Sequence, residues 1–367
     1  MFKNKKVLIL GFGREGMSTY RFLRNMYPDM HLTIADKNEI KLDDKNVTLI
    51  CGDSYMDSLN DFDIVMKSPG IAFLDVDIKD GTLVTCQTDL FLKFAPCRKV
   101  GITGSKGKTT TSTLIYDMLK EGGFDARLIG NIGVPVLEDI NTVTPETIAV
   151  IEMSSHQLEF TTSSPEVAVL TNIYEEHLDH YRDGFRGYVN AKLNIVRRQK
   201  ESDTFIYNAT QGLDGLCDLG KIKSHKVGVK KDAPLPFAVN NEHLLGEHNR
   251  QDILFALEAA KHFGVDTAAA ERAVEKFSGI EHRMEKVGTF RGITFYNDCI
   301  ATIPHAVECA VEALKNVDTL IFGGMDRGLD YSEFENYLKK SNIKNLIGTP
   351  ATGHKICDKI EGAPSKN

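Results

Sequence analysis

A loop of glycines, lysines and threonines at residues 103–111 constrains this chain more than any other feature of its 367 residues. The loop follows the apolar run 99–102 and precedes a stretch whose apolar residues recur at helical spacing. Glycines free a backbone to wrap around a phosphate, and a helix behind such a loop directs its positive end to the same point. A strand, a glycine loop and a helix in this order predict an α/β domain that binds a nucleoside triphosphate.

The loop departs from the strict Walker pattern, which has a glycine five residues before Gly107, where this chain has Ile102. Lys108 can neutralise β- and γ-phosphate oxygens, and the hydroxyl of Thr109 can reach Mg²⁺. A lysine-rich turn capped by threonines is the alternative, which the order of strand, glycines, lysine and helix disfavours. The predicted ATP contacts of the loop are Gly104, Ser105, Lys106, Gly107, Lys108, Thr109 and Thr110.

A second glycine loop, Gly11-Phe12-Gly13-Arg14-Glu15-Gly16, follows the apolar run 5–10. Its spacing lets backbone N–H groups approach a diphosphate at the start of a helix. Asp36, at the end of the next apolar run, could accept a hydrogen bond from a ribose hydroxyl. NAD binding is the obvious interpretation, with tight strand–helix packing as the alternative. A phosphate loop in a second unit disfavours a dehydrogenase, because hydride transfer has no use for a γ-phosphate site.

Three polar residues of the middle of the chain follow buried-type strands or lie beyond them. Glu152 ends the apolar run 148–151 and is well placed to hold Mg²⁺, although a helix-start acid beside capping serines is an alternative. His177 could bind a second metal or a phosphoryl oxygen, or could be an ordinary surface histidine. Lys192 by itself is typical of a solvated helix face.

Strands and helices alternate along the chain, which predicts parallel sheets covered by helices. The formal net charge of −7 argues against a nucleic-acid binder, and no apolar run approaches the ~20 residues of a membrane helix. Seven scattered cysteines form no zinc or disulfide pattern and fit a reducing compartment. We therefore expect a cytoplasmic enzyme that acts on small molecules, binds no nucleic acid or membrane, and is a monomer.

In combination, the motifs resemble the Mur ligases over residues 1 to about 335, and the N-terminal loop with Ser-Pro-Gly-Ile is similar to the MurD branch of that family. The motif S-S-x-Q-L-E also favours this branch. In chain order the motifs are T-G-x-x-G-K-T-T-T from Thr103, G-N-I-G from Gly130, E-M-S-S-H-Q-L-E from Glu152, E-H-L-D-H-Y from Glu176, A-K-L from Ala191, G-E-H-N from Gly246, E-H-R from Glu281 and N-D at Asn297.

The resemblance implies an α/β protein of three domains. These are a Rossmann-like UDP-binding domain (1–95), a central P-loop ATPase domain (96–282) and a Rossmann-like ligase domain (283–367) that looks incomplete. It also implies that ATP and two Mg²⁺ ions drive the addition of glutamate to UDP-N-acetylmuramoyl-L-alanine through an acyl phosphate.

The resemblance carries roles over to individual residues. The implied UDP-substrate contacts are Gly13, Arg14, Asp36, Ser68, Pro69, Gly70, Ile71, Asn131, Ser154 and Gln157. The implied ATP contacts beyond the phosphate loop are Asn249, Arg283 and Asp298. The implied metal ligands are Thr109, Glu152, His177 and Lys192, the last of them as a carbamate. Lys108, His177 and Lys192 are the implied catalytic residues.

Two departures from the family pattern concern the glutamate end of the site. The family lysine of N-D-S-K-A-T is Ile300 here, and Thr302 and Arg327 are the remaining candidates to bind glutamate. The serine-rich loop that follows in the family has no counterpart before Asn367. The sequence is therefore compatible with a truncated product and with a natural short form. A catalytically impaired protein that binds the UDP precursor and ATP is the alternative function, and D- and L-glutamate are both open.

Overall fold

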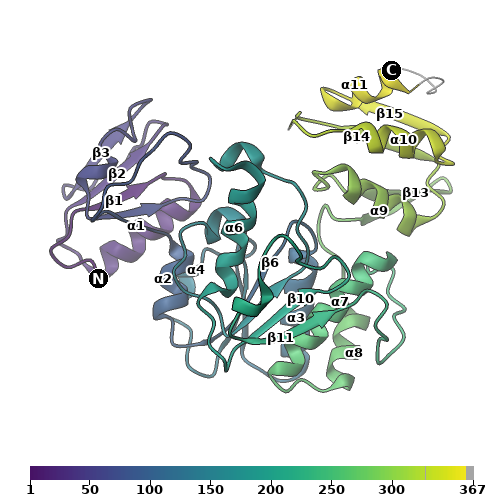
Figure 1. The fold of residues 1–367 in the computed structure, drawn as a ribbon, viewed down its shortest axis with the longest axis horizontal. Coiled ribbons are helices and arrows are strands. Elements are labelled where there is room, and N and C mark those ends of the chain that lie inside the picture. The colour runs from purple at the N-terminus through teal and green to yellow at the C-terminus, as the bar shows by residue number, and fades with distance from the viewer. Residues whose placement is uncertain (327, 361–367) are drawn as a thin grey trace. The chain divides into compact units, whose positions relative to one another are not determined.

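The computed structural model describes residues 1–326 and 328–360 (Figure 1). The contacts within the chain divide it into two compact units. The first unit contains residues 1–237 and 252–274, and the second contains 238–251 and the residues from 275 onward. Arg327, a predicted glutamate contact, lies outside the described residues. The division into three domains at 95 and 282 stays a prediction.

A five-stranded parallel sheet forms the N-terminal part of the first unit, in the order β3-β2-β1-β4-β5. The apolar run that predicted the first strand is fully buried at the centre of this sheet, so the G-x-G-x-x-G loop begins at a central carboxyl edge. The strands are β1 (Val7–Leu10), β2 (Leu32–Asp36), β3 (Val47–Cys51), β4 (Ile64–Lys67) and β5 (Leu83–Thr85); helices α1 (Arg14–Met26) and α2 (Gln87–Phe94) accompany them.

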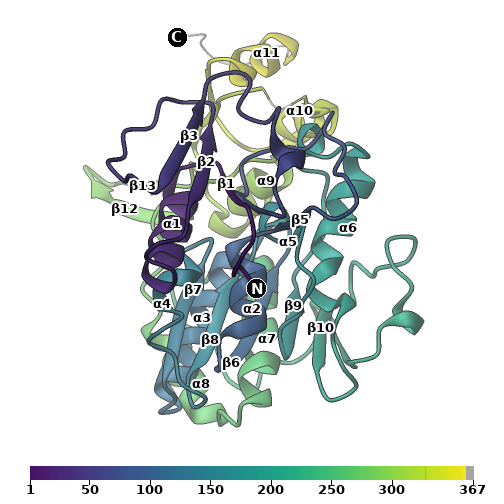
Figure 2. The same cartoon turned by 90° about the vertical axis from the view of Figure 1, so that its left-hand side faces the viewer.

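A six-stranded parallel sheet forms the rest of the first unit, in the order β11-β10-β9-β6-β8-β7, and Figure 2 shows its strands side by side. The strands are β6 (Arg98–Thr103), β7 (Ala126–Gly130), β8 (Ile148–Glu152), β9 (Val167–Leu170), β10 (Thr204–Asn208) and β11 (His225–Val229). The helices are α3 (Lys108–Glu121), α4 (Val136–Asp139), α5 (Ser155–Leu158), α6 (Gly184–Arg197) and α8 (Thr267–Lys276), with α7 (Gly246–His262) shared by both units.

Strand order places the predicted catalytic groups at one edge of this sheet. β6 lies between β8 and β9, and parallel strands present their carboxyl ends at the same edge. The phosphate loop follows β6, Glu152 ends β8, and Thr171 follows β9. One buried apolar cluster packs beneath both sheets and includes Ile9 of β1 and Ile151 of β8, so the two sheets share a core.

In its described residues, the second unit contains two small sheets and three helices of its own. β12 (Glu285–Phe290) pairs antiparallel with β13 (Ile293–Asn297), and β14 (Thr319–Gly323) pairs in parallel with β15 (Asn345–Thr349). The helices are α9 (Pro304–Leu314), α10 (Ser332–Lys340) and α11 (Thr352–Lys359). These elements confirm the strand–helix alternation predicted for the third part of the chain.

The apolar runs 5–10, 99–102 and 148–151 are the strands β1, β6 and β8, with ends within two residues of those runs. The edge strands β3, β5 and β7 were not predicted, because edge strands carry fewer apolar residues than central ones. The short helix α2 was not predicted either. Within the described residues, no helix combines the length and the apolar character needed to cross a membrane.

Candidate active site

The phosphate loop has a backbone conformation that only glycine accepts easily at two positions. Gly104 and Gly107 have φ angles of +155° and +81°. A Cβ atom at Gly104 would collide with the hydroxyl of Thr171, and one at Gly107 would collide with the carboxylate of Asp252. The two glycines that predicted a phosphate site are therefore required by this fold.

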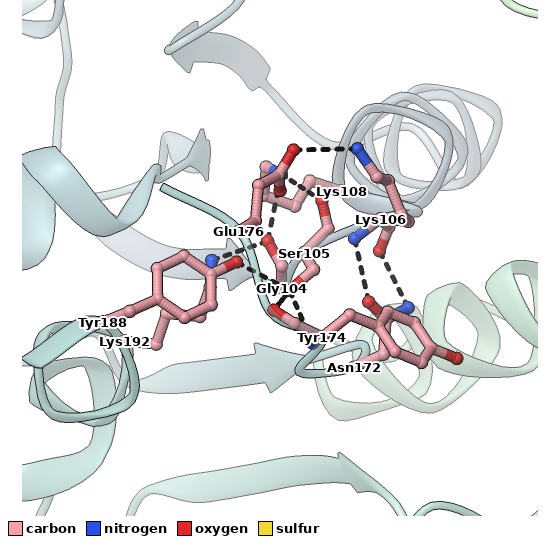
Figure 3. Close-up of polar contacts among 9 residues, drawn as sticks. All are labelled: Gly104, Ser105, Lys106, Lys108, Asn172, Tyr174, Glu176, Tyr188 and Lys192. Atoms are coloured by element: carbon pink, nitrogen blue, oxygen red, sulfur yellow. Dashed lines mark hydrogen bonds and ion pairs between the residues drawn. The ribbon is translucent and has the colours of Figure 1, made fainter. Parts of the chain in front are cut away.

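Two residues after β9 hold the loop in place. The Thr171 hydroxyl donates to the Lys106 carbonyl at 2.6 Å. Figure 3 shows Asn172, whose amide donates to the Lys106 carbonyl at 3.0 Å and whose Oδ1 accepts from the Lys106 N–H at 2.8 Å. The sequence analysis assigned no role to these two side chains. They could have been predicted from their position directly after β9, because the carboxyl ends of neighbouring parallel strands lie at the same edge of the sheet.

Three lysine amino groups are gathered at the same loop. Lys108 Nζ donates to the carbonyls of Gly104 and Ser105, each at 3.0 Å, and Lys192 Nζ donates to Gly104 at 2.7 Å. Lys106 Nζ forms an ion pair of 3.0 Å with Glu176. The positive charges of Lys106 and Lys108 fit an anionic ligand with several charges, as a triphosphate is.

Lys192 is a buried residue and not the solvated lysine that its sequence context suggests. Its side chain is 1 % exposed, and its Nζ lies 4.6 Å from the centre of the Tyr188 ring. Burial, followed by the charge of Lys108, holds the pKa of Lys192 well below its ordinary value. This environment therefore favours the neutral amine over the ammonium form.

The predicted magnesium ligand Glu152 is 1 % exposed at the end of β8. Its Oε1 accepts a hydrogen bond of 2.7 Å from the Asn131 amide, whereas its Oε2 is buried without a hydrogen-bond partner. A buried carboxylate oxygen without a donor fits a cation ligand. No group of three or more His, Cys, Asp or Glu side chains among residues 1–326 and 328–360 is arranged to hold a metal ion.

His177 lies in a group of aromatic rings beside the site. Its φ angle is +56°, and its ring centre is 4.7 Å from that of His156, which in turn lies 3.9 Å from that of His180. Burial, followed by the charges of His180 and His177, lowers the pKa of His156 to about 3. Sequence reasoning predicted a role for His177 but none for the other two histidines.

A cavity of about 520 Å³ brings together most of the residues predicted to bind the UDP precursor. The predicted residues that line it are Gly13, Arg14, Asp36, Ser68, Pro69, Gly70, Ile71 and Asn131. They come from the G-x-G-x-x-G loop, from the ends of β2 and β4, and from the segment after β7, so the cavity unites both sheets of the first unit.

Asp36 has a structural role in this cavity that the sequence did not reveal. Its carboxylate accepts hydrogen bonds from the backbone N–H groups of Phe12 at 2.6 Å and Asn38 at 2.8 Å. The Asp36 carboxylate therefore holds the backbone of the glycine loop in place. The Arg14 guanidinium donates to the carbonyl of Gly133, across to the second sheet.

Ser154 and Gln157 are not among the residues that line the cavity. They form a capping box at the start of α5, in which each side chain bonds the backbone of the other. Gln157 Nε2 also donates to the Glu15 carboxylate at 2.8 Å, and burial raises the pKa of Glu15. Glu15 lines the cavity and was not predicted as a site residue.

The remaining predicted ATP residues belong to the second unit. Asn249 Nδ2 donates to the Leu245 carbonyl at 2.8 Å, and Asp298 Oδ1 accepts from the Met284 N–H at 3.0 Å. The Nε of Arg283 is buried without a hydrogen-bond partner. Ile300, the departure from the family lysine, is 45 % exposed and lies two residues before Thr302.

Comparison with known families identifies the class of protein that this fold and site define. The family model "Mur ligase middle domain" matches residues 102–234, and "Mur ligase MurD-like, N-terminal domain" matches residues 5–84. These matches cover the phosphate loop and the diphosphate loop respectively. The chain belongs to the Mur ligase family of ATP-dependent, amide-bond-forming enzymes.

Curated relatives place the chain near one branch of the family. It is 33 % identical to the UDP-N-acetylmuramoylalanine–D-glutamate ligase of Clostridium kluyveri, over 99 % of this chain and 84 % of the relative. It is 34 % identical to the enzyme of the same name from Ligilactobacillus salivarius, over 92 % of this chain and 80 % of the relative. These relatives do not favour the alternative of a catalytically impaired binding protein.

Solved structures of other Mur ligases share the fold. MurF of Thermotoga maritima, in complex with ADP, is 16 % identical with a TM-score of 0.61, covering 97 % of this chain and 84 % of its own. MurC of the same organism is 19 % identical with a TM-score of 0.56, covering 97 % and 88 %. The predicted α/β Mur ligase architecture is thereby confirmed.

Proposed function

We propose that this chain joins D-glutamate to UDP-N-acetylmuramoyl-L-alanine with hydrolysis of ATP, in the synthesis of peptidoglycan precursors. The observation that carries the proposal is the bond between Asn131 and Glu152. Asn131 lines the diphosphate-loop cavity, and its amide holds the carboxylate that lies beside the phosphate-loop strand. One hydrogen bond therefore links the proposed UDP-precursor site to the proposed ATP site.

The chemistry follows from the charges at the phosphate loop. The alanyl carboxylate of the precursor attacks the γ-phosphorus of ATP, which forms an acyl phosphate and releases ADP. The amine of glutamate then attacks the acyl carbon, and inorganic phosphate leaves as the amide forms. Lys108 lies at the loop that would hold the γ-phosphate, where its ammonium would stabilise the charge that develops during transfer.

The residues present fit a role for Mg²⁺. Glu152, with its buried and unpartnered Oε2, and Thr109 would hold one ion, while His177 and carbamylated Lys192 would hold the second. Bound magnesium supplies charge neutralisation for phosphoryl transfer. The low pKa of Lys192 supports carbamylation, because only the neutral amine adds to carbon dioxide.

In the second unit we assign Asn249, Arg283 and Asp298 to ATP, and Thr302 and Arg327 to glutamate. The enzyme would act in the cytoplasm, where ATP and UDP-linked precursors are available, and as a monomer.

The test is phosphate release from ATP by the purified chain, with the amide product identified by mass. We expect release only when UDP-N-acetylmuramoyl-L-alanine and D-glutamate are both present. L-glutamate and UDP-N-acetylmuramate without alanine are the matched controls. Release that is indifferent to precursor and amino acid would contradict the proposal.

A further inference from the structure

Lys67 is a buried cation that the proposed reaction does not use. It ends β4, directly before the cavity segment 68–71, and its side chain is 1 % exposed. Its Nζ lies 3.1 Å from Glu159 Oε2, and the ring centres of Phe73 and Phe160 lie 5.4 and 5.3 Å away. The ammonium is thus enclosed by two aromatic rings and one carboxylate.

Glu159 connects this cation to a second element. Its Oε2 also accepts from His180 Nε2 at 3.3 Å, and the two side chains are 17 % and 9 % exposed. Burial opposes ionisation of Glu159, but the hydrogen bond from His180 and the charge of Lys67 outweigh it, so the pKa of Glu159 is lowered. Glu159 is therefore a carboxylate that joins a residue of the first sheet to one of the 178–180 turn.

The histidine rings extend this contact to the active site. The His180 ring packs on that of His156 with centres 3.9 Å apart, and the His156 ring lies 4.7 Å from that of His177. His177 is the N-cap of the same turn that contains His180. A continuous path of contacts therefore runs from the end of β4 to a proposed metal ligand.

The cost of this arrangement argues against a purely stabilising role. A buried ion pair loses much of its attraction to desolvation, and apolar side chains of the same size would stabilise a fold at least as well. Directional ionic contacts do, however, select one arrangement of the groups that they join. Here they join the segment that lines the cavity to the turn that contains His177.

We propose that Lys67, Glu159 and His180 form a positioning triad, which holds His177 in register with the cavity segment 68–71. The inference rests on the proposed function, because it gives the triad the task of aligning the two ends of one substrate. The precursor would lie along 68–71 at its nucleotide end and present its carboxylate near His177. None of the three residues needs to touch the reacting atoms.

The kinetic test uses Lys67→Met, Glu159→Gln and the double variant, which keep side-chain size. Each single variant leaves one charge of the ion pair buried without its partner. The double variant removes both charges and therefore reports the role of the pair without this penalty. We expect kcat to fall about tenfold to a hundredfold in each single variant, with UDP binding within about twofold of wild type. The kcat of the double variant should be at least as high as that of the less active single variant, because the two residues act as a unit.

Arg21→Met is the matched control. Arg21 of α1 pairs with Glu138 of α4 at 2.9 Å and also joins the two sheet regions, but it is exposed and far along the chain from the histidine turn. Its kcat should stay within about twofold of wild type. Additive losses in the double variant, or an equal loss in Arg21→Met, would overturn the triad.

Hydrogen exchange provides a readout that does not depend on turnover. In the full chain, the amides of residues 174–182 should exchange faster in Glu159→Gln and in the double variant than in wild type or Arg21→Met. Unchanged exchange in every variant would refute the triad even in an active enzyme. A wild-type chain without turnover would instead count against the proposed function, and the exchange result would still decide the triad.

Replacing His156 separates packing from chemistry in the ring path. His156→Phe keeps an aromatic ring between His180 and His177, and His156→Ala removes it. We expect the phenylalanine variant to keep kcat within about threefold and the alanine variant to lose about tenfold. Equal activity of the two variants would show that the ring path does not position His177.

Discussion

At the residue scale, the three lysines at the phosphate loop differ in burial and in pKa because their surroundings differ. Lys106, Lys108 and Lys192 all point to the phosphate loop, but only Lys192 is fully buried and held well below its ordinary pKa. The same residue type therefore forms an ion pair in one position, donates to loop carbonyls in another, and is buried with a lowered pKa in the third.

Replacing Lys108 by alanine should abolish ATP turnover, with a loss of at least about a hundredfold in kcat. The reason is that its ammonium lies at the loop that would hold the transferring phosphoryl group. Steady-state phosphate release measures the effect. Lys120→Ala, which removes an exposed lysine of the same helix, is the control. Activity of Lys108→Ala within tenfold of wild type would refute the phosphate-loop assignment.

Lys192→Ala should be inactive but recover part of its activity when short carboxylates such as formate or acetate are added. A small carboxylate can enter the space of the missing side chain and replace a carbamate as an anionic ligand. Activity titrated against carboxylate concentration measures this, with chloride at equal ionic strength as the control. Absence of rescue in a folded variant would count against carbamylation.

At the element scale, contacts between elements decide how the central sheet is held at its amino edge. Glu166, before β9, accepts from Arg98 of β6 at 2.6 Å and from His262 of α7 at 3.0 Å. Burial alone would raise the pKa of Glu166, but these two partners outweigh it and lower the pKa to about 2. A single carboxylate thus ties two strands and a helix together.

This pairing predicts a defined pH dependence of stability. Because the folded pKa of about 2 is below the ordinary value of 4.5, the contribution of Glu166 is complete above pH 4.5 and is lost as the pH falls toward 2. Glu166→Gln should therefore unfold at lower denaturant than wild type at pH 7, and the difference should shrink between pH 4.5 and 2. A difference that is constant over this range would contradict the pairing.

At the scale of the whole molecule, the two proposed nucleotide sites draw on different parts of the chain. The cavity that unites the predicted UDP-precursor residues lies entirely within the first unit. Asn249, Arg283 and Asp298 lie in the second unit. Substitutions in the second unit should therefore weaken the binding of ATP and leave the binding of the UDP precursor unchanged.

Arg283→Ala should raise the KM for ATP about tenfold or more, since a charged hydrogen-bond donor to the nucleotide would be lost. Calorimetric binding of UDP should not change. Lys340→Ala, at the end of α10 in the same unit, is the control for charge. Weaker UDP binding in Arg283→Ala with unchanged KM for ATP would contradict the assignment.

Local features of the chain determined the elements and the two loops. Buried central strands are continuous apolar runs, and glycine spacing reports a backbone that must approach a phosphate, so both can be read without a structure. Gly13, Arg14, the 68–71 segment and Asn131 were predicted and share one cavity. Ser154 and Gln157 were predicted beside them but cap α5.

Only the tertiary structure decided which distant residues meet. Burial of Lys192, the bond from Asn131 to Glu152, and the contact between Lys67 and Glu159 depend on strand order, with partners 21 to 92 residues apart. No local pattern reports such pairs, because burial and pKa arise from neighbours that the fold supplies. The sequence by itself determined that this chain has two glycine loops that follow strands of parallel sheets. The fold determined how the charges around them are coupled.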